Sequence, residues 1–230
     1  MVTGNLKFDI DVADAALALG RELRIRFGDA RPVWLAASTR EGEEALILDA
    51  WRAQAGAQAG APAALLVLVP RHPQRFDDVA RLVAGHGFTL QRRSTLDLDA
   101  AAAEVVDADV LLGDSMGEMF AYYAACDCAF IGGSLLPLGG QNLIEACALG
   151  KPVLVGEHTF NFLQATAEAV DAGAALRVAD AAQLVLAARG LLGAAGSARR
   201  AHMGAKALAF AGRHRGATAR TVELLRPFIE

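Results

Sequence analysis

Short apolar runs separated by helix-length segments constrain the fold of this chain more than any other feature of its sequence. Several of the runs are apolar at consecutive positions, which is typical of strands buried on both faces of a parallel sheet. Strands that alternate with helices favour such a sheet, with helices on both sides and right-handed crossovers. The pattern therefore predicts an α/β, Rossmann-like fold. The predicted strands are residues 33–37, 64–69, 88–91, 110–112, 128–131, 153–155 and 174–178.

The segments that flank this alternation are predicted to be mainly helical. Residues 1–31 begin with a polar lead and then place apolar side chains at roughly helical spacing, so we expect a linker and a first helix there. Beyond residue 180 the pattern is helical only, with breaks at 192–196 and 212–216. Residues 32–230 are therefore expected to form one domain that ends in extra helices.

Composition and charge exclude several classes of protein. Of the 230 residues, 54% are hydrophobic and 21% are charged, which argues against a disordered chain. No apolar run reaches the roughly 18 residues that a membrane-spanning helix needs, so we expect a soluble chain. A formal net charge of -4 removes the electrostatic reason to expect non-specific binding of nucleic acid.

Cysteine and histidine give no sign of a metal centre. Cys126, Cys128 and Cys147 are odd in number and form no C-x-x-C pair, which favours a reduced, cytosolic context. The five histidines show no metal-ligand spacing. The sequence therefore predicts no structural metal.

Unusual polar segments follow four of the predicted strands, at residues 38–44, 70–73, 113–118 and 132–145. Ligands of open α/β sheets bind beyond the carboxyl ends of the strands, so function is expected at these junctions. A simpler interpretation is helix capping, because three pairs of residues have the spacing of a capping box. These pairs are Ser38 with Glu41, Ser115 with Glu118, and Asn142 with Glu145. At the first two pairs, capping alone and ligand binding remain open.

The segment 132–145 contains more glycine than a helix cap requires. Its four glycines and its lack of charge before Glu145 favour a phosphate or carboxylate site, because glycine lets backbone amides approach an anion closely. Glu145 would accept hydrogen bonds from the vicinal hydroxyls of a ribose. Arg71, held between Pro70 and Pro73, suits fork-like recognition of a phosphate, and the alternative is a solvated surface arginine.

In order and spacing, these motifs resemble the C-terminal half of the bacterial 3-deoxy-D-manno-octulosonic acid (Kdo) transferases, which are glycosyltransferases of the GT-B fold. Nearly the whole chain takes part in the resemblance. The segments that carry it are ASTREGEE at 37–44, VPRHPQRF at 69–76, GDSMGE at 113–118, GGS at 132–134, GGQNLIE at 139–145, GKPVL at 150–154 and HTFNF at 158–162.

The resemblance implies a donor-binding domain over residues 32–230, preceded by an interdomain linker and first helix over residues 1–31. The implied reaction transfers Kdo from CMP-Kdo to a lipid A precursor with inversion, in lipopolysaccharide biosynthesis, without a metal at the donor phosphate and with no cofactor besides the donor substrate. CMP would be surrounded by Pro70, Arg71, Met116, Gly117, Glu118, Gly133, Ser134, Asn142, Leu143, Ile144 and Glu145.

The resemblance also implies a missing partner domain. Complete members of the family have an N-terminal domain with the acceptor site, a glutamate general base and a membrane-associating start, at the cytoplasmic face of the inner membrane. We therefore name no catalytic residue in this chain and expect it to be inactive alone. Arg40 and Gln141 stand where the family more often has histidine, which leaves a catalytic role at either position without support.

Two other functions compete with this interpretation. One is an autonomous nucleotide-binding or regulatory module with no transferase partner. The other is a nicotinamide-dependent oxidoreductase, which shares the fold class, although the chain lacks the G-x-G-x-x-G fingerprint.

Overall fold

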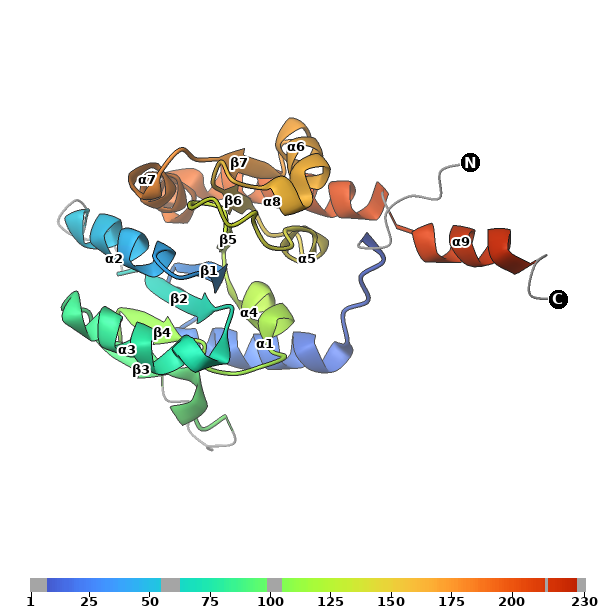
Figure 1. The fold of residues 1–230 in the computed structure, drawn as a ribbon. Coiled ribbons are helices and arrows are strands. Elements are labelled where there is room, and N and C mark those ends of the chain that lie inside the picture. Colours follow the sequence, from blue (N-terminus) through green and yellow to red (C-terminus); the bar gives the residue numbers. More distant parts are fainter. Residues whose placement is uncertain (1–7, 55–62, 99–104, 214, 227–230) are drawn as a thin grey trace.

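The computed structural model describes residues 8–54, 63–98, 105–213 and 215–226, in which helices cover both faces of one parallel sheet (Figure 1). The sheet has the order β3-β4-β2-β1-β5-β6-β7, and all neighbouring strands are parallel. The predicted α/β, Rossmann-like fold is confirmed, and every predicted strand overlaps an observed one. The strands are β1 (Val33–Thr39), β2 (Leu65–Pro70), β3 (Leu90–Arg92), β4 (Val110–Leu112), β5 (Cys128–Ile131), β6 (Val153–Val155) and β7 (Ala175–Arg177).

The helices divide between the two faces of the sheet. α1, α4, α5 and α6 pack on one face, α2, α3 and α7 pack on the other, and α8 contributes side chains to both cores. The helices are α1 (Asp14–Phe27), α2 (Glu43–Ala53), α3 (Phe76–Gly85), α4 (Met119–Ala125), α5 (Ile144–Ala148), α6 (Leu163–Asp171), α7 (Ala181–Leu192), α8 (Ser197–Arg213) and α9 (Ala217–Leu225). Short 3-10 turns are η3 (Pro73–Arg75), η4 (Arg93–Thr95), η5 (Phe160–Phe162) and η6 (Ala194–Gly196).

The central strand β1 shows why the sequence selects this arrangement. Its successive side chains point to opposite faces, so Trp34 and Leu35 belong to different cores, and both are fully buried. Trp34 packs against Trp51 of α2 with ring centroids 5.1 Å apart. The unbroken apolar run at residues 33–37 of β1 therefore requires helices on both sides.

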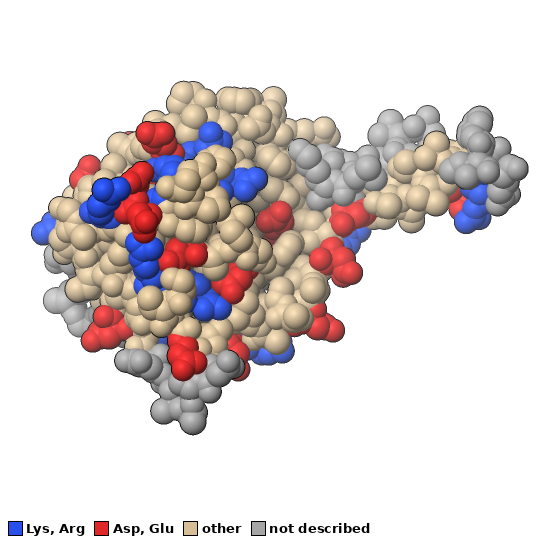
Figure 2. All heavy atoms as spheres, turned by 60° about the horizontal axis from the view of Figure 1, so that its bottom comes forward, with Lys and Arg blue, Asp and Glu red and all other residues tan. Residues whose placement is uncertain are grey.

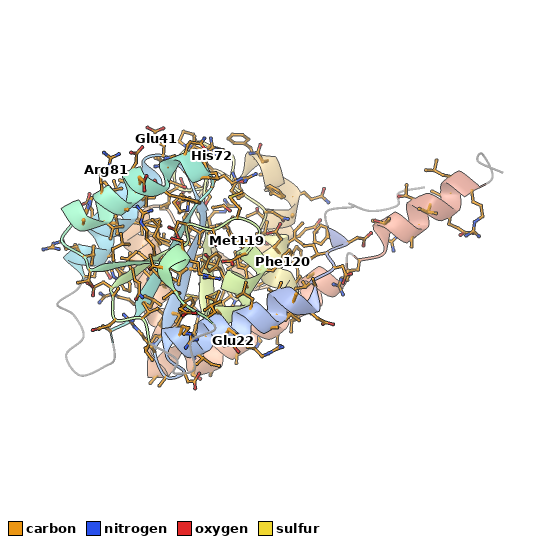
Figure 3. The ribbon with its side chains drawn as sticks, turned by 90° about the horizontal axis from the view of Figure 1, so that it is seen from below. Glu22, Glu41, His72, Arg81, Met119 and Phe120 are labelled. Atoms are coloured by element: carbon orange, nitrogen blue, oxygen red, sulfur yellow. The ribbon has the colours of Figure 1, made fainter. Side chains whose placement is uncertain are left out.

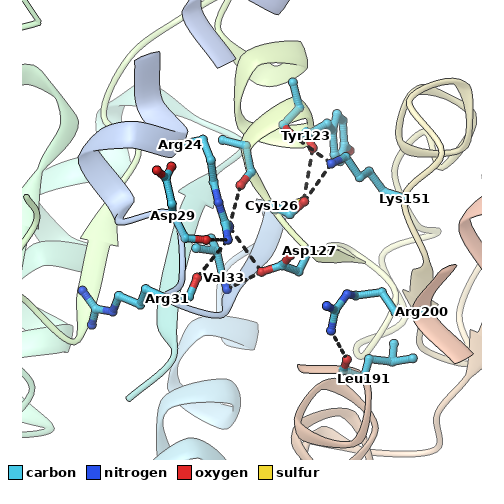
Figure 4. Close-up of polar contacts among 12 residues, drawn as sticks. Arg24, Asp29, Arg31, Val33, Tyr123, Cys126, Asp127, Lys151, Leu191 and Arg200 are labelled. Carbon is cyan, nitrogen blue, oxygen red and sulfur yellow. Dashed lines mark hydrogen bonds and ion pairs between the residues drawn. The ribbon is translucent and has the colours of Figure 1, made fainter. Parts of the chain in front are cut away.

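A polar cluster ties the amino ends of the central strands to α1 and α4 (Figure 4). Asp127 accepts a hydrogen bond from the backbone N–H of Val33 at 2.8 Å and pairs with Arg24 of α1 at 3.2 Å. Lys151 donates to two carbonyl oxygens at the end of α4, at 3.0 and 2.8 Å. The lysine of the GKPVL segment thus supports the fold at the end of the sheet opposite to the strand carboxyl ends.

The first and last helices agree with the helical predictions for the chain ends. α1 packs on α4 with Leu23 and Phe27 fully buried, while residues 1–7 of the predicted linker lie outside the described residues. The predicted helical breaks fall at η6 and between α8 and α9. α9 projects from the body (Figure 1) and exposes Val222, Leu224 and Leu225. The predicted domain boundary at residue 31 stays a prediction.

The described surface mixes charges of both signs. On the face seen in Figure 2, blue and red side chains alternate rather than gathering into one basic area. Within the described ranges no single helix is long and apolar enough to cross a membrane; the stretches 181–192 and 194–225 pass that test only together, as a pair bent by 84°.

Candidate functional site

A cavity of about 390 Å³ opens at the carboxyl ends of the central strands. This volume falls within the range of small-molecule sites, and it lies where the chain leaves β1, β2, β4 and β5. Figure 3 shows Met119, at the start of α4, between His72 and the α1 side chain Glu22 in that view. The cavity is lined by Ser38, Val69, Pro70, Arg71, Ser115, Met116, Gly117, Glu118, Met119, Tyr122, Tyr123, Gln141, Asn142, Glu145 and Phe162.

The segment after β2 brings the predicted cation to this cavity. Pro70 ends β2 and is buried, whereas Arg71 is exposed at the cavity wall. The backbone N–H of Arg71 donates to the carbonyl of Thr39 at 2.9 Å, which fixes the start of the segment to the end of β1. This contact fixes the backbone from which the Arg71 side chain projects at the cavity wall.

The turn after β4 contributes a carboxylate that already has partners. Glu118 accepts hydrogen bonds from Arg93 at 2.9 Å and from the Ser115 hydroxyl at 2.6 Å, and that hydroxyl lies 2.6 Å from the Tyr122 hydroxyl. Burial raises the pKa of Tyr122, so its hydroxyl keeps its proton at neutral pH. Gly117 has φ 80°, a conformation that favours glycine and lets the turn expose Met116.

The glycine-rich segment after β5 folds back on itself before it enters α5. The backbone N–H of Gly140 donates to Gly133 at 2.7 Å, and that of Gln141 donates to Gly132 at 3.0 Å. This fold places the side chains of Gln141, Asn142 and Glu145 at the cavity. The segment is a small closed loop rather than an open, flexible lid.

Glu145 is a partly buried carboxylate facing this space. The Asn142 side chain donates to Glu145 at 3.1 Å and accepts from the backbone N–H of Ile144 at 3.0 Å. Burial raises the pKa of Glu145, and the bond from Asn142 and the charge of Arg71 oppose that shift. The cavity therefore combines one cation, a carboxylate with accepting capacity and amide side chains, which suits a ligand with one anionic group and several hydroxyls.

The capping interpretation is right in part at Asn142 and wrong at the other two positions. Asn142 bonds the second amide beyond it, as a cap does, while Glu145 bonds the Asn142 side chain. No side chain caps α2 or α4. The N-cap residue of α2 is Gly42 rather than Ser38, and Ser115 bonds the Glu118 side chain instead of a helix amide.

The structure brings most of the predicted site residues together but separates a buried subset. Pro70, Arg71, Met116, Gly117, Glu118, Asn142 and Glu145 line the cavity, and Gly133, Ser134, Leu143 and Ile144 do not. The Ser134 hydroxyl donates to Ile131 and accepts from the backbone of Gly156, so it holds two strand ends together. Leu143 and Ile144 pack into the core beneath the cavity.

Sequence reasoning missed several lining residues, chiefly Met119, Tyr122, Tyr123 and Phe162. Tyr122 could have been found, because Ser115, Glu118 and Tyr122 have the i, i+3, i+7 spacing of one helical face. Phe162 lies in a short 3-10 turn whose position depends on the packing of the whole sheet edge. Its segment, HTFNF at 158–162, was recognised as a motif, but nothing in that motif assigns Phe162 to the site.

No group of three or more His, Cys, Asp or Glu side chains within the described part of the chain is placed to hold a metal ion.

The fold matches that of known glycosyltransferase structures. The structure of WaaG, a glycosyltransferase involved in lipopolysaccharide biosynthesis, superposes with a TM-score of 0.59 at 15% identity, over 96% of this chain and 53% of that one. A likeness at this identity shows the fold alone. The chain thus has the fold of the C-terminal domain of a GT-B glycosyltransferase.

Closer matches define the family. The C-terminal CMP-Kdo binding domain of WaaA from Acinetobacter baumannii has a TM-score of 0.75 and 32% identity, and the match covers 86% of this chain and 98% of that domain. The 3-deoxy-D-manno-octulosonic acid transferase of Bordetella pertussis is 47% identical over 228 residues, which is 99% of this chain and 51% of the relative. The chain belongs to the family of 3-deoxy-D-manno-octulosonic acid transferases and corresponds to its C-terminal domain.

The chain spans about half the length of the curated relatives it matches. No family model matches it.

Proposed function

We propose that this chain is the donor half of an inverting Kdo transferase and binds CMP-Kdo in the cavity at the strand ends. The observation that carries the proposal is the convergence of five of the seven motif segments on one cavity, in a chain that covers nearly all of a solved CMP-Kdo binding domain. The complete enzyme would transfer Kdo to a lipid A precursor at the cytoplasmic face of the inner membrane. An N-terminal domain would supply the acceptor site and the general base.

In the proposed complex each part of CMP meets a group suited to it. Arg71 binds the phosphate, Glu145 accepts from the ribose hydroxyls, and the Met116-Gly117-Glu118 turn and Asn142 enclose the rest. The lining would be supported from beneath by four residues that do not line the cavity themselves, Gly133, Ser134, Leu143 and Ile144. No resident cofactor or metal is part of the proposal.

Calorimetric titration with CMP and with NADH, side by side, tests the proposal. We expect CMP to bind and NADH to give no heat of binding, because the cavity presents one cation and the chain has no dinucleotide fingerprint. Binding of NADH as tight as that of CMP, or no binding of CMP, would reject the donor-site proposal.

Arg71→Lys is expected to weaken CMP binding although the charge is kept. An ammonium cannot reproduce the planar fork, and loss of one of two phosphate bonds costs about 1 kcal/mol, or roughly fivefold in Kd. Cytidine, which lacks the phosphate, serves as the control ligand and should bind both proteins equally. If cytidine loses as much affinity as CMP, Arg71 does not contact the phosphate.

A further inference from the structure

Two adjacent carboxylates at the start of α2 are buried beside the cavity without lining it. Glu43 and Glu44 are both 0% exposed, although glutamate is rarely fully buried without partners. Removing a carboxylate from water is costly, so each needs strong compensating contacts. Their partners lie on different sides of the cavity.

Glu43 binds the glycine-rich segment. Its carboxylate accepts from the backbone N–H groups of Arg40 at 2.9 Å, Gly133 at 2.6 Å and Leu135 at 3.0 Å. Gly133 in turn accepts from Gly140, next to Gln141. Glu43 is therefore two hydrogen bonds away from the start of the segment that presents Gln141, Asn142 and Glu145.

Glu44 binds the segment after β2. Arg75 of η3 donates to both of its carboxylate oxygens, at 2.7 and 3.0 Å, and the Thr39 hydroxyl donates at 2.8 Å. Such a bidentate pair fixes orientation as well as distance. The backbone of Thr39 also holds Arg71, so Glu44 anchors both ends of the connection that carries Arg71.

We propose that Glu43 and Glu44 are positioning residues of the donor site, Glu43 for the wall that carries Glu145 and Glu44 for the wall that carries Arg71. The inference rests on the proposed function, since it assigns the two walls to one ligand. The division of labour follows from the contacts, because each carboxylate contacts one wall and the two share the first turn of one helix. One rigid element thus sets the width of the cavity.

Crossed double-mutant cycles on CMP affinity test this assignment. Glu43→Gln and Glu44→Gln are each combined with Glu145→Ala and with Arg71→Ala, and binding is measured well below every melting temperature. We expect Glu43→Gln to raise the Kd about tenfold, which is about 1.4 kcal/mol. That loss should shrink to about threefold or less in the Glu145→Ala background and persist with Arg71→Ala, because only coupled residues are non-additive. Glu44→Gln should show the reverse pattern.

Glu41→Gln is the matched control, since Glu41 is exposed in the same segment, at the edge of the molecule in Figure 3. It should leave the Kd unchanged. Should a glutamine variant fail to fold, Glu43→Asp and Arg75→Lys probe the same two walls while keeping the charge. Lower melting temperatures with unchanged CMP affinity, or losses that add in every background, would reduce the pair to a purely structural role and overturn the proposal.

Amide hydrogen exchange without nucleotide separates this inference from the proposed function. Glu43→Gln should speed exchange at Gly133 and Leu135, and Glu44→Gln should speed it at Arg71. If the unmodified chain does not bind CMP, the donor-site proposal fails, while exchange still reports whether each carboxylate holds its own wall. If each variant speeds amide exchange by the same factor at both walls, the assignment of one carboxylate to each wall is contradicted.

Discussion

Alone, this chain is expected to bind CMP but to incorporate no Kdo into a lipid A precursor. Transfer requires the acceptor hydroxyl, a base and the donor carbon to be held together, and such positioning accounts for about 7 to 11 kcal/mol of barrier reduction in favourable cases. The chain spans about half the length of its curated relatives. Of its cavity carboxylates, Glu118 is engaged by Arg93 and Ser115, and Glu145 is assigned to the ribose.

The assay measures incorporation of Kdo from CMP-Kdo by residues 1–230, with an intact relative as the positive control. The chain is then supplemented with the other half of that relative, and turnover that appears only in the mixture supports the assignment as a donor half. CMP binding by the same preparation shows that it is folded. Robust turnover by residues 1–230 unaided would place the base within this sequence and overturn the assignment.

The fold was largely predictable because its strands are buried on both faces. Residues 110–112, 128–131 and 153–155 were predicted to the residue, since an apolar run bounded by turn residues has few alternatives in this context. Strand β3 begins at Leu90 rather than at Phe88. The side chain and backbone of Thr89 instead bind Asp109, which directly precedes the neighbouring strand β4, and no local pattern around Thr89 indicates this contact.

The order of the strands could not be predicted in the same way. β1 pairs with β5, and β4 inserts between β2 and β3, so neighbours in the sheet are distant in the sequence. The motifs nevertheless indicated that these ends converge, because parallel strands present their carboxyl ends at one edge. Position along the chain thus predicted the edge of the sheet but not which strands meet there.

Within the site, the sequence predicted which segments carry polar residues better than it predicted which of their side chains reach the cavity. Ser134 and Ile144 lie in the same glycine-rich segment, 132–145, as Asn142 and Glu145, yet their side chains are fully buried and do not line the cavity. The direction of each side chain depends on how the loop folds back through Gly133 and Gly140, which is a tertiary contact. The sequence pattern places Glu43 only in a polar strand end, because its burial depends on backbone amides of the segment after β5.

Replacing Glu145 by alanine is expected to weaken CMP binding more than any other single substitution proposed for the donor site. The ribose hydroxyls would lose an ionised acceptor, and hydrogen bonds to charged groups contribute about 1.5 to 3 kcal/mol, or roughly 10- to 150-fold in Kd. Calorimetry with CMP measures the loss. Glu157→Ala, at an exposed position after β6, is the control and should bind CMP as the unmodified chain does.

The pH dependence of that loss identifies the carboxylate as the acceptor. Burial raises the pKa of Glu145 above its ordinary value of 4.5. The ionised form accepts the hydroxyl bonds, so CMP binding favours it and releases a proton where the free carboxyl is still protonated. Affinity should therefore rise with pH through that raised pKa and then level off.

The ionisation of CMP itself cancels in the ratio of the Kd of Glu145→Ala to that of the unmodified chain. We expect this ratio to be largest at neutral pH and to shrink on acidification. Equal affinity in the alanine variant, or a ratio independent of pH, would show that Glu145 does not bind the ribose.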